Sequence, residues 1–403
     1  MATPGAANTR PDRAFIVLLS ALVAFQAIST DLYLPSLPAI TADLGTDIGA
    51  VQLTLSLFLL GFGVGQLFWG AASDRFGRRP VLLAGLAAYL LSTLACALAP
   101  SIGLLVLFRL LQGASACAAV VLGRAVVRDL WEPREAARVL SYLASAMALA
   151  PMAGPVLGGW LTELWGWRAN FHALALFGAL VLLASWRLLG ETNRLRDPRA
   201  LDPRRFWGGC RIILANPAFR AHALAAAFVY SGIFAFISGS SYVLIELAGL
   251  SPRLYGLAFA TAAFGYMLGG LAGGRLNRRL AIAGLLRTGA TIALAAAAGG
   301  FALSLRVEPD FAGIVAPVFL YMFGAGLVLP AAMAGAIGPF PERAGAASAL
   351  LGFVQLLVAA SAGMVVAVLY DGTARPMTGV LVLAAAATAG AAFIAARTRA
   401  APR

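Results

Sequence analysis

The sequence lacks lysine altogether and holds only two histidines and three cysteines among its 403 residues. His172 and His222 stand far apart, the cysteines form no C-x-x-C pair, and no Walker-type loop is present. The spacings that metal ligands and nucleotide phosphates require are therefore missing. We expect no metal, no bound cofactor, no active site of a soluble enzyme, and free thiols at Cys96, Cys117 and Cys210.

Charge is scarce as well. Charged residues make up 12% of the chain and apolar residues 61%, which leaves far too little polar surface to coat a water-soluble globule of this length. The composition excludes an ordinary soluble domain and indicates an integral membrane protein surrounded by a lipid bilayer.

Long apolar segments are what the chain has in abundance. Windows of about 20 residues, the length that crosses a bilayer as a helix, recur from one end of the sequence to the other. They predict an all-α membrane protein with twelve transmembrane helices. The expected spans are residues 14–38, 51–71, 80–99, 102–124, 138–161, 170–189, 219–244, 254–274, 281–304, 312–336, 344–369 and 376–396.

The 30 basic residues are all arginines, and they are distributed unevenly. Only Arg168, Arg253, Arg306 and Arg375 fall in connections on one side, Arg109 falls inside a span, and the other 25 belong to the opposite side, which includes both tails. Because cytoplasmic loops collect positive charge, both termini are expected in the cytoplasm. The net charge of +13 therefore reflects membrane topology, and no nucleic-acid partner is expected.

The longest connection divides the chain into two sets of six spans. Residues 1–189 are expected to form one six-helix bundle, residues 190–218 a cytoplasmic linker, and residues 219–403 a second bundle. Within the linker, Asp202-Pro203 resembles a helix start, and apolar side chains alternate with arginines. These features favour a short helix on the membrane surface, although an irregular solvated linker would have a similar composition.

One connection, residues 70–81, is short and strongly charged, with one acid and three arginines between glycines. Such a loop can bind carboxylates or helix C-terminal carbonyls on a neighbour, across a cytoplasmic seam, and so hold one conformation. Positive charge that only fixes the topology would also explain its arginines. We expect a conformational latch made of Gly70, Asp74, Arg75, Gly77, Arg78 and Arg79.

The same pattern returns 200 residues later. Residues 65–79 align without gaps on residues 265–279, and the three arginines keep their positions. Gly274 replaces Asp74 in the second copy, so the second latch should be weaker. One half of the protein therefore looks like a relative of the other.

Two opposite charges lie inside predicted spans at a similar depth. Asp31 is about nine residues, or ~13 Å, from the far end of its span, and Arg109 about eight residues, or ~12 Å. Intramembrane charges are functional hypotheses by default, and these two are expected to meet or compete across a cavity as a proton-coupling pair. The alternatives are a fixed ion pair and, for Arg109, bonding to backbone carbonyls that holds helices together.

The fifth predicted span, residues 138–161, contains a segment rich in small residues and proline. Gly154, Pro155, Gly158 and Gly159 allow helices to pass closely, and the proline removes one backbone hydrogen bond. Helix packing alone could account for this composition.

Four of these strings resemble motifs of the major facilitator superfamily. The charged loop is similar to its G-x-x-x-D-R-x-G-R-R signature, and Arg109-Leu110-Leu111-Gln112-Gly113 to the R-x-x-Q-G motif of proton-coupled antiporters. The segment 31–38 resembles the D-x-Y-L-P-x-x-P string of the bicyclomycin- and chloramphenicol-resistance (Bcr/CflA) branch. Residues 154–159 are similar to the G-P-x-x-G-G element of drug antiporters, with Ala150 where the fuller pattern has glycine.

The resemblance implies two pseudo-symmetric six-helix bundles in a bacterial inner membrane and proton-driven export of small, largely apolar drugs by a monomer. A metabolite exporter of the same fold and a non-transporting scaffold or receptor remain as alternatives. The side chains expected to line a cavity between the bundles, besides Arg109, are Gln26, Tyr33, Gln52, Gln112, Tyr230, Phe234, Phe236, Tyr242, Tyr266, Tyr321 and Gln355.

Overall fold

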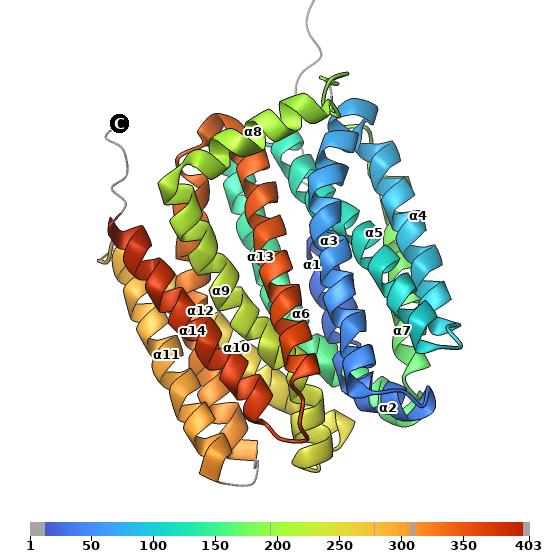
Figure 1. The fold of residues 1–403 in the computed structure, drawn as a ribbon. Coiled ribbons are helices and arrows are strands. Elements are labelled where there is room, and N and C mark those ends of the chain that lie inside the picture. Colours follow the sequence, from blue (N-terminus) through green and yellow to red (C-terminus); the bar gives the residue numbers. More distant parts are fainter. Residues whose placement is uncertain (1–12, 194, 278, 307–310, 398–403) are drawn as a thin grey trace, which may run out of the picture.

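The computed structural model describes residues 13–193, 195–277, 279–306 and 311–397, and within these ranges it contains helices and no strands. Both chain termini and Arg278 lie outside the described residues. Twelve long helices run roughly alongside one another, six on each side of the linker (Figure 1). Eleven of these helices are long and apolar enough to cross a membrane. The twelfth long helix, α6, has 33 residues.

The first half contains the helices up to residue 188. They are α1 (Arg13–Asp31), a short 3-10 turn (Leu34–Ser36), α2 (Leu37–Asp43), α3 (Ile48–Phe76), α4 (Arg78–Ala97), α5 (Ile102–Leu130), α6 (Pro133–Trp165) and α7 (Arg168–Leu188).

The second half begins after α8 (Pro203–Ala215), which lies in the linker. Its elements are α9 (Pro217–Ser241), a π-helical turn (Tyr242–Leu247), α10 (Pro252–Leu276), α11 (Ile282–Arg306), α12 (Phe311–Ile337), a 3-10 turn (Pro341–Arg343), α13 (Ala344–Val368) and α14 (Arg375–Arg397).

The first predicted span, residues 14–38, is not one continuous helix. Helix α1 ends at Asp31, and the chain then turns through a 3-10 segment into α2. Pro35 and Pro38 lie at the starts of the two following elements, where the missing N–H costs nothing but where a helix arriving from upstream must end. Asp31 therefore occupies the end of α1, inside the candidate membrane span Arg13–Asp43.

The two halves meet along two helix pairs, α3 with α13 and α6 with α10. We call the end of the bundle that carries the α3–α4 connection and α8 the arginine-rich end. At the opposite end, three contacts join the halves: Thr41 Oγ1 to the Tyr242 hydroxyl at 3.0 Å, Gln52 Nε2 to the Ser238 carbonyl at 3.0 Å, and an Arg253–Glu163 ion pair at 3.0 Å. The seam between the halves is closed at that end.

Helix α8 lies within the linker, residues 190–218. Asp202 precedes it, and its carboxylate accepts a hydrogen bond from the Arg204 N–H at 2.9 Å. The helix crosses the arginine-rich end at a steep angle to the spans (Figure 1). Its buried residues, Cys210 and Ile213, face the helices it packs on, α9 and α13.

Candidate functional site

Arg109 is completely buried in α5. Its Nη1 donates to the Ser29 carbonyl of α1 at 3.2 Å and to Gln112 Oε1, one turn further along α5, at 2.6 Å. The guanidinium also lies 4.3 Å from the ring centre of Phe58 and 4.6 Å from that of Tyr33. Neutral acceptors and aromatic faces thus hold this cation, and each contributes favourably where water is excluded.

Hydrogen bonds and ring contacts connect Arg109 to four helices of the first half. Gln112 Nε2 donates to Thr93 Oγ1 of α4 at 2.8 Å. The Tyr33 hydroxyl is 2.7 Å from Thr54 Oγ1 of α3. A connected network of this kind fixes the relative positions of α1, α3, α4 and α5 around the charge.

Asp31 lies at the C-terminal end of α1, buried, with one side-chain hydrogen bond, from Thr30 Oγ1 at 2.9 Å. Gly154 of α6 packs directly against it, because an added Cβ there would lie 3.0 Å from Asp31 Cβ. From the second half, Tyr230 of α9 and Tyr255 of α10 lie near enough to interact electrostatically with its carboxylate. Asp31 is therefore placed where α1, α6 and the second half meet.

Asp31 and Arg109 form no ion pair among the described residues. The arginine reaches the same helix through the carbonyl of Ser29, two residues before Asp31, while the carboxylate is held by Thr30. The sequence predicted that the two charges meet or compete. In this conformation Arg109 contacts α1, the helix that ends at Asp31, but the two charges do not pair. This arrangement does not match a fixed ion pair.

The small-residue segment of α6 faces both halves at once. A Cβ at Gly158 would overlap the Leu32 carbonyl, just after α1, and one at Gly159 would overlap the Pro252 carbonyl at the start of α10. In the other direction, Gly256 of α10 lies against the Pro155 carbonyl. These glycines are therefore required for close backbone approach on two sides, as the sequence led us to expect for packing.

The predicted cavity residues fall into two groups. Gln26 and Tyr230 lie near each other and near Asp31, half-buried, and Tyr266 and Gln355 are also half-buried. The others make packing contacts or hydrogen bonds with neighbouring helices in this conformation rather than facing a cavity. Gln52 bridges the halves, Tyr242 contacts Thr41, Phe236 stacks on Phe259 with ring centres 5.5 Å apart, Phe234 packs on Gly363, and the Tyr321 hydroxyl donates to the Val229 carbonyl at 2.9 Å.

Several residues of this site were not singled out from the sequence. Thr30 and Thr93 supply hydroxyls to Asp31 and Gln112, and Tyr255 of α10 lies near enough to Asp31 for an electrostatic interaction. Thr30 adjoins the acid, which was an available signal. The contributions of Thr93 and Tyr255 depend on helix packing alone.

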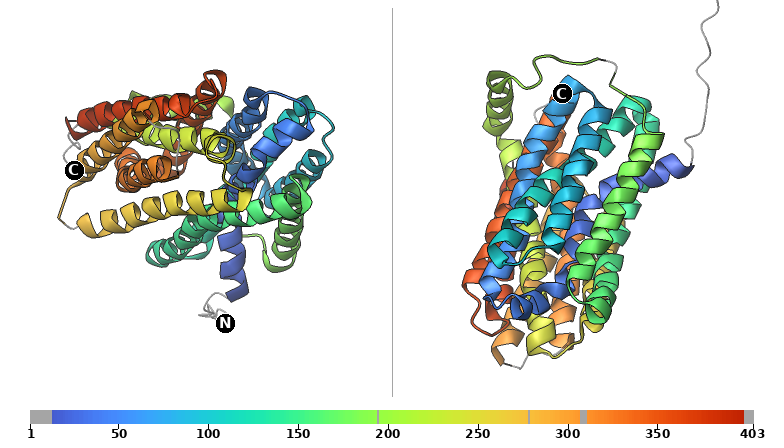
Figure 2. Two further views of the ribbon diagram at one scale, coloured as in Figure 1. Left: turned by 90° about the horizontal axis from the view of Figure 1, so that it is seen from below. Right: turned by 90° about the vertical axis from the view of Figure 1, so that its right-hand side faces the viewer.

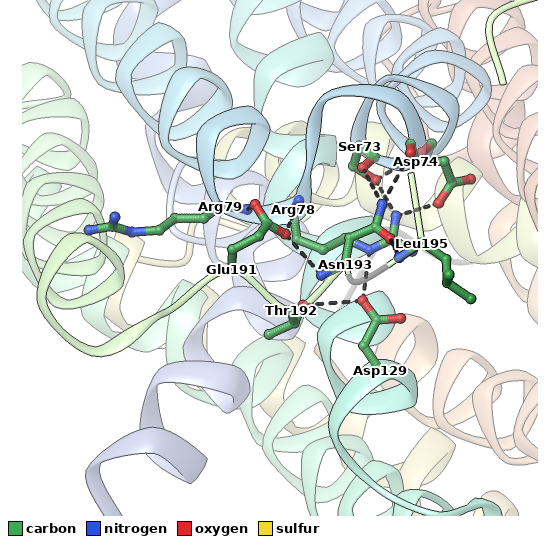
Figure 3. Close-up of polar contacts among 10 residues, drawn as sticks. Ser73, Asp74, Arg78, Arg79, Asp129, Glu191, Thr192, Asn193 and Leu195 are labelled. Carbon is green, nitrogen blue, oxygen red and sulfur yellow. Dashed lines mark hydrogen bonds and ion pairs between the residues drawn. The ribbon is translucent and has the colours of Figure 1, made fainter. Parts of the chain in front are cut away.

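The charged loop forms a network centred on Arg78 (Figure 3). Its Nη1 donates to Asp74 Oδ1 and, at 2.6 Å, to Ser73 Oγ, and its Nε donates to Asp129 Oδ2 of α5 at 2.9 Å. Gly77 supplies the turn between α3 and α4 with a φ of 106°, a conformation that favours glycine. One arginine thereby joins the end of α3 to the end of α5.

The segment after α7 completes this network (Figure 3). Glu191 accepts the backbone N–H groups of Arg78 at 2.9 Å and Arg79 at 3.3 Å, and Asn193 Nδ2 donates to the Asp74 carbonyl at 3.1 Å. Partial burial raises the pKa of Glu191, but the backbone N–H groups of Asn193, Arg78 and Arg79 outweigh it and hold that pKa below its ordinary value. The linker is thus docked on the charged loop.

The described side-chain bonds of the loop go to the Asp129 carboxylate of α5 and to a carbonyl near the end of α7. These are the kinds of partner that the sequence suggested, but they lie in the same half rather than across a seam. The reason is proximity, because Asp129 and Glu191 end neighbouring elements of the same half. Arg79 likewise donates to the Trp186 carbonyl of α7 at 2.9 Å. Nothing in the sequence distinguishes Asp129 and Glu191 from other acidic residues near the ends of helices.

Comparison with known proteins agrees with this architecture. A model of the Major Facilitator Superfamily matches residues 19–364. Multidrug resistance protein D of Escherichia coli K12 is 31% identical over 346 residues, 84% of this chain and 85% of that protein. A chloramphenicol resistance protein of Pseudomonas aeruginosa is 31% identical over 367 residues, 90% of this chain and 86% of that protein. A bicyclomycin resistance protein homolog of Haemophilus influenzae is 28% identical over 363 residues, 90% and 91% of the two chains.

Solved structures match over nearly the whole chain. A bacterial homolog to the human lysosomal transporter Spinster, inward-facing and unoccupied, gives a TM-score of 0.77 at 18% identity, covering 98% of this chain and 100% of that one. A D-xylose-proton symporter gives 0.69 at 16% identity, covering 94% and 97%. The twelve long helices, the charged loop and the family match together show that this chain is a multi-pass membrane transporter of the Major Facilitator Superfamily, with relatives that agree with its Bcr/CflA branch.

Proposed function

We propose that this transporter exports small, largely apolar drugs in exchange for protons across a bacterial inner membrane, with its arginine-rich end in the cytoplasm. Support for the substrate class comes from the names of its relatives, which are multidrug, bicyclomycin and chloramphenicol resistance proteins. The uneven distribution of arginine supports the orientation. Amphenicols and bicyclomycin are the first compounds to test.

The position of Asp31 is the observation that carries the proton-coupling proposal. The carboxyl is buried at the end of α1 against Gly154 of α6, and among the described residues no cation forms an ion pair with it. A neutral carboxyl fits such a place at little cost, whereas a charged one is costly without water or a partner. Gain and loss of a proton at Asp31 would therefore bias how the halves meet around it.

Arg109 acts as a positioning residue in this scheme. Its bond to the Ser29 carbonyl holds the last turn of α1, and its positive charge stays within the first half whether or not Asp31 is charged. When the halves rock, a small movement of α1 would bring Asp31 toward this charge or away from it. The protonation state of the carboxyl and the conformation are then linked.

The test is Asp31→Asn in the purified protein, reconstituted in liposomes with an imposed pH gradient. We expect the variant to stay folded, to release no protons on chloramphenicol binding, and to lose uphill transport while downhill exchange persists. The matched control is Asp47→Asn, because Asp47 caps α3 from an exposed position and asparagine caps a helix about equally well. A folded Asp31→Asn protein that still releases protons and still concentrates drug would refute the carrier role.

The same liposomes separate the alternatives. A metabolite exporter would move sugars or amino-acid derivatives in preference to amphenicols, and a scaffold or receptor would show no proton flux with any compound. A drug-resistance spectrum in a pump-deficient host would identify the substrates among the candidates.

A further inference from the structure

Helix α8 is held against the second half by a narrow face only. Of its 13 residues, Cys210 and Ile213 are buried against α9 and α13, and most of the others are exposed. Figure 2 (right) shows this yellow-green helix at the rim of the arginine-rich end rather than over its middle. Its free surface therefore lies beside the boundary between lipid and water.

The exposed surface of α8 has two different sides. Arg204, Trp207, Arg211 and Leu214 are spaced at i, i+3, i+7 and i+10, so they form one row along the helix. Trp207 is 67% exposed and Leu214 42% exposed, although both are apolar. Arg205 and Ile212 lie seven residues apart and so face the same side of the helix. That side is rotated by roughly a third of a turn from the row.

The arginines of the two sides differ in their partners. Arg205 forms an ion pair with Asp197 in the linker. Within the part of the chain that the structure describes, Arg204 and Arg211 form no ion pair. The row thus offers two unneutralised guanidinium groups next to an exposed indole, while the opposite flank is already neutralised.

We propose that the row Arg204, Trp207, Arg211 and Leu214 binds the phosphate headgroups of anionic phospholipids in the leaflet at the arginine-rich end. Guanidinium groups bind phosphate oxygens through two parallel hydrogen bonds, and indole rings concentrate at the level of the headgroups. The inference concerns the linker surface and does not depend on which drug is transported. It rests on the proposed topology only in naming the leaflet as cytoplasmic.

A lipid fits this row better than a soluble anion does. A free phosphate or a nucleic acid would satisfy the arginines but leave Trp207 and Leu214 exposed to water, whereas a lipid surface covers all four side chains. The position of α8 at the rim of the bundle favours the same partner. The chemistry and the location therefore agree on a phospholipid with a negative headgroup.

The experiment measures retention of phosphatidylglycerol by the full-length protein in detergent, using native mass spectrometry, with phosphatidylcholine as the zwitterionic reference. Each arginine near an anionic surface contributes about a fivefold change in affinity. We expect Arg204→Gln and Arg211→Gln each to weaken phosphatidylglycerol binding about fivefold, and the double variant about 25-fold. Phosphatidylcholine retention should not change.

Two matched controls make the result specific. Arg205→Gln removes the same charge from the opposite flank, and Ile212→Ala truncates an exposed apolar residue there; both should leave phosphatidylglycerol binding within twofold. Trp207→Ala should weaken it. Equal loss in Arg205→Gln, no preference of the unmodified protein for phosphatidylglycerol over phosphatidylcholine, or full displacement of the lipid by millimolar inorganic phosphate would each overturn the proposal.

Discussion

The α3–α4 connection and its counterpart between α10 and α11 are two copies of one pattern with different surroundings. In the first copy, Arg78 binds Asp74 and Asp129, and Glu191 binds the backbone on the far side of Gly77. In the second copy, Gly274 has no carboxylate to offer, and Arg278 lies outside the described residues.

The backbone also differs between the two copies. Gly77 turns the chain with a φ of 106°, while Asn277 at the corresponding place has a φ of −59° and continues helically, its N–H bonded to the Gly273 carbonyl. Both copies keep the three arginines, whereas the acid and the glycine with positive φ are found in the first copy, where Arg78 is the centre of the network. The comparison suggests that Asp74 and Gly77 are the two positions to test.

Alanine substitution of one glycine in each copy should show the largest difference between the copies. Gly77→Ala places a side chain at a positive φ, which costs about 1–3 kcal/mol, and its Cβ would overlap the Glu191 carboxylate. Gly274→Ala meets open space near the end of a helix and should be neutral or stabilise by about 0.5–1 kcal/mol. Thermal unfolding of both variants in detergent measures this, and equal melting temperatures would contradict it.

Asp74→Asn should separate alternation from binding. Asparagine keeps the shape but not the charge that Arg78 binds, so we expect turnover to fall several-fold while the dissociation constant for drug changes little. Transport in liposomes and equilibrium binding in detergent provide the two quantities. Loss of binding with unchanged turnover per bound drug would remove the latch from the mechanism.

The acid on the linker should give a smaller, pH-dependent effect. Because the folded protein holds the pKa of Glu191 below its ordinary value near 4.5, its contribution to stability is complete above that value and is lost as pH falls through the folded pKa. Glu191→Gln should therefore cost less than about 1 kcal/mol at pH 7, as for an exposed site, and flatten the fall in melting temperature below pH 4.5. Parallel melting curves for both proteins over that range would argue against it.

The smallest effect is expected from restoring the acid alone. Gly274→Asp gives the second copy the residue it lacks, but Asn277 keeps a helical backbone there and no equivalent of the Glu191 contact is described. We expect a change of less than about 0.5 kcal/mol in stability, as for a typical surface substitution, and unchanged turnover. A clear gain in either would mean that the carboxylate suffices to build the network.

Much of the fold follows from hydropathy, since long apolar windows must cross the bilayer as helices. The exact helix ends depend on capping residues, glycines and prolines rather than on hydropathy. The span expected at 51–71 extends over Ile48–Phe76, because Asp47 caps its start and Gly77 ends it, while hydropathy detects only the part inside the hydrocarbon. The end of α1 at Asp31 was not predicted, although Pro35 and Pro38 signal it, whereas Asp202-Pro203 did predict the start of α8.

The contacts of the site were predictable only in part. An intramembrane acid and arginine stand out in an apolar sequence, but whether they pair depends on how α1 and α5 pack, and here the guanidinium takes the Ser29 carbonyl instead. The docking of Glu191 on the charged loop joins residues 113 positions apart in sequence. Such a pairing is set by the ends of α3, α5 and α7 meeting in space, which local patterns do not encode.

The contact between α6 and α10 has a consequence for rates. Where Gly159 lies on the Pro252 carbonyl and Gly256 on the Pro155 carbonyl, the two halves approach through backbone, and beside them the Arg253 side chain pairs with Glu163 and lies 4.0 Å from the ring centre of Trp160. Helices packed ridge into groove must unmesh before they can slide, which raises the barrier to movement. At the glycines themselves there is little to unmesh, so at this crossing the barrier to rocking should come mainly from the Arg253 contacts with Glu163 and Trp160.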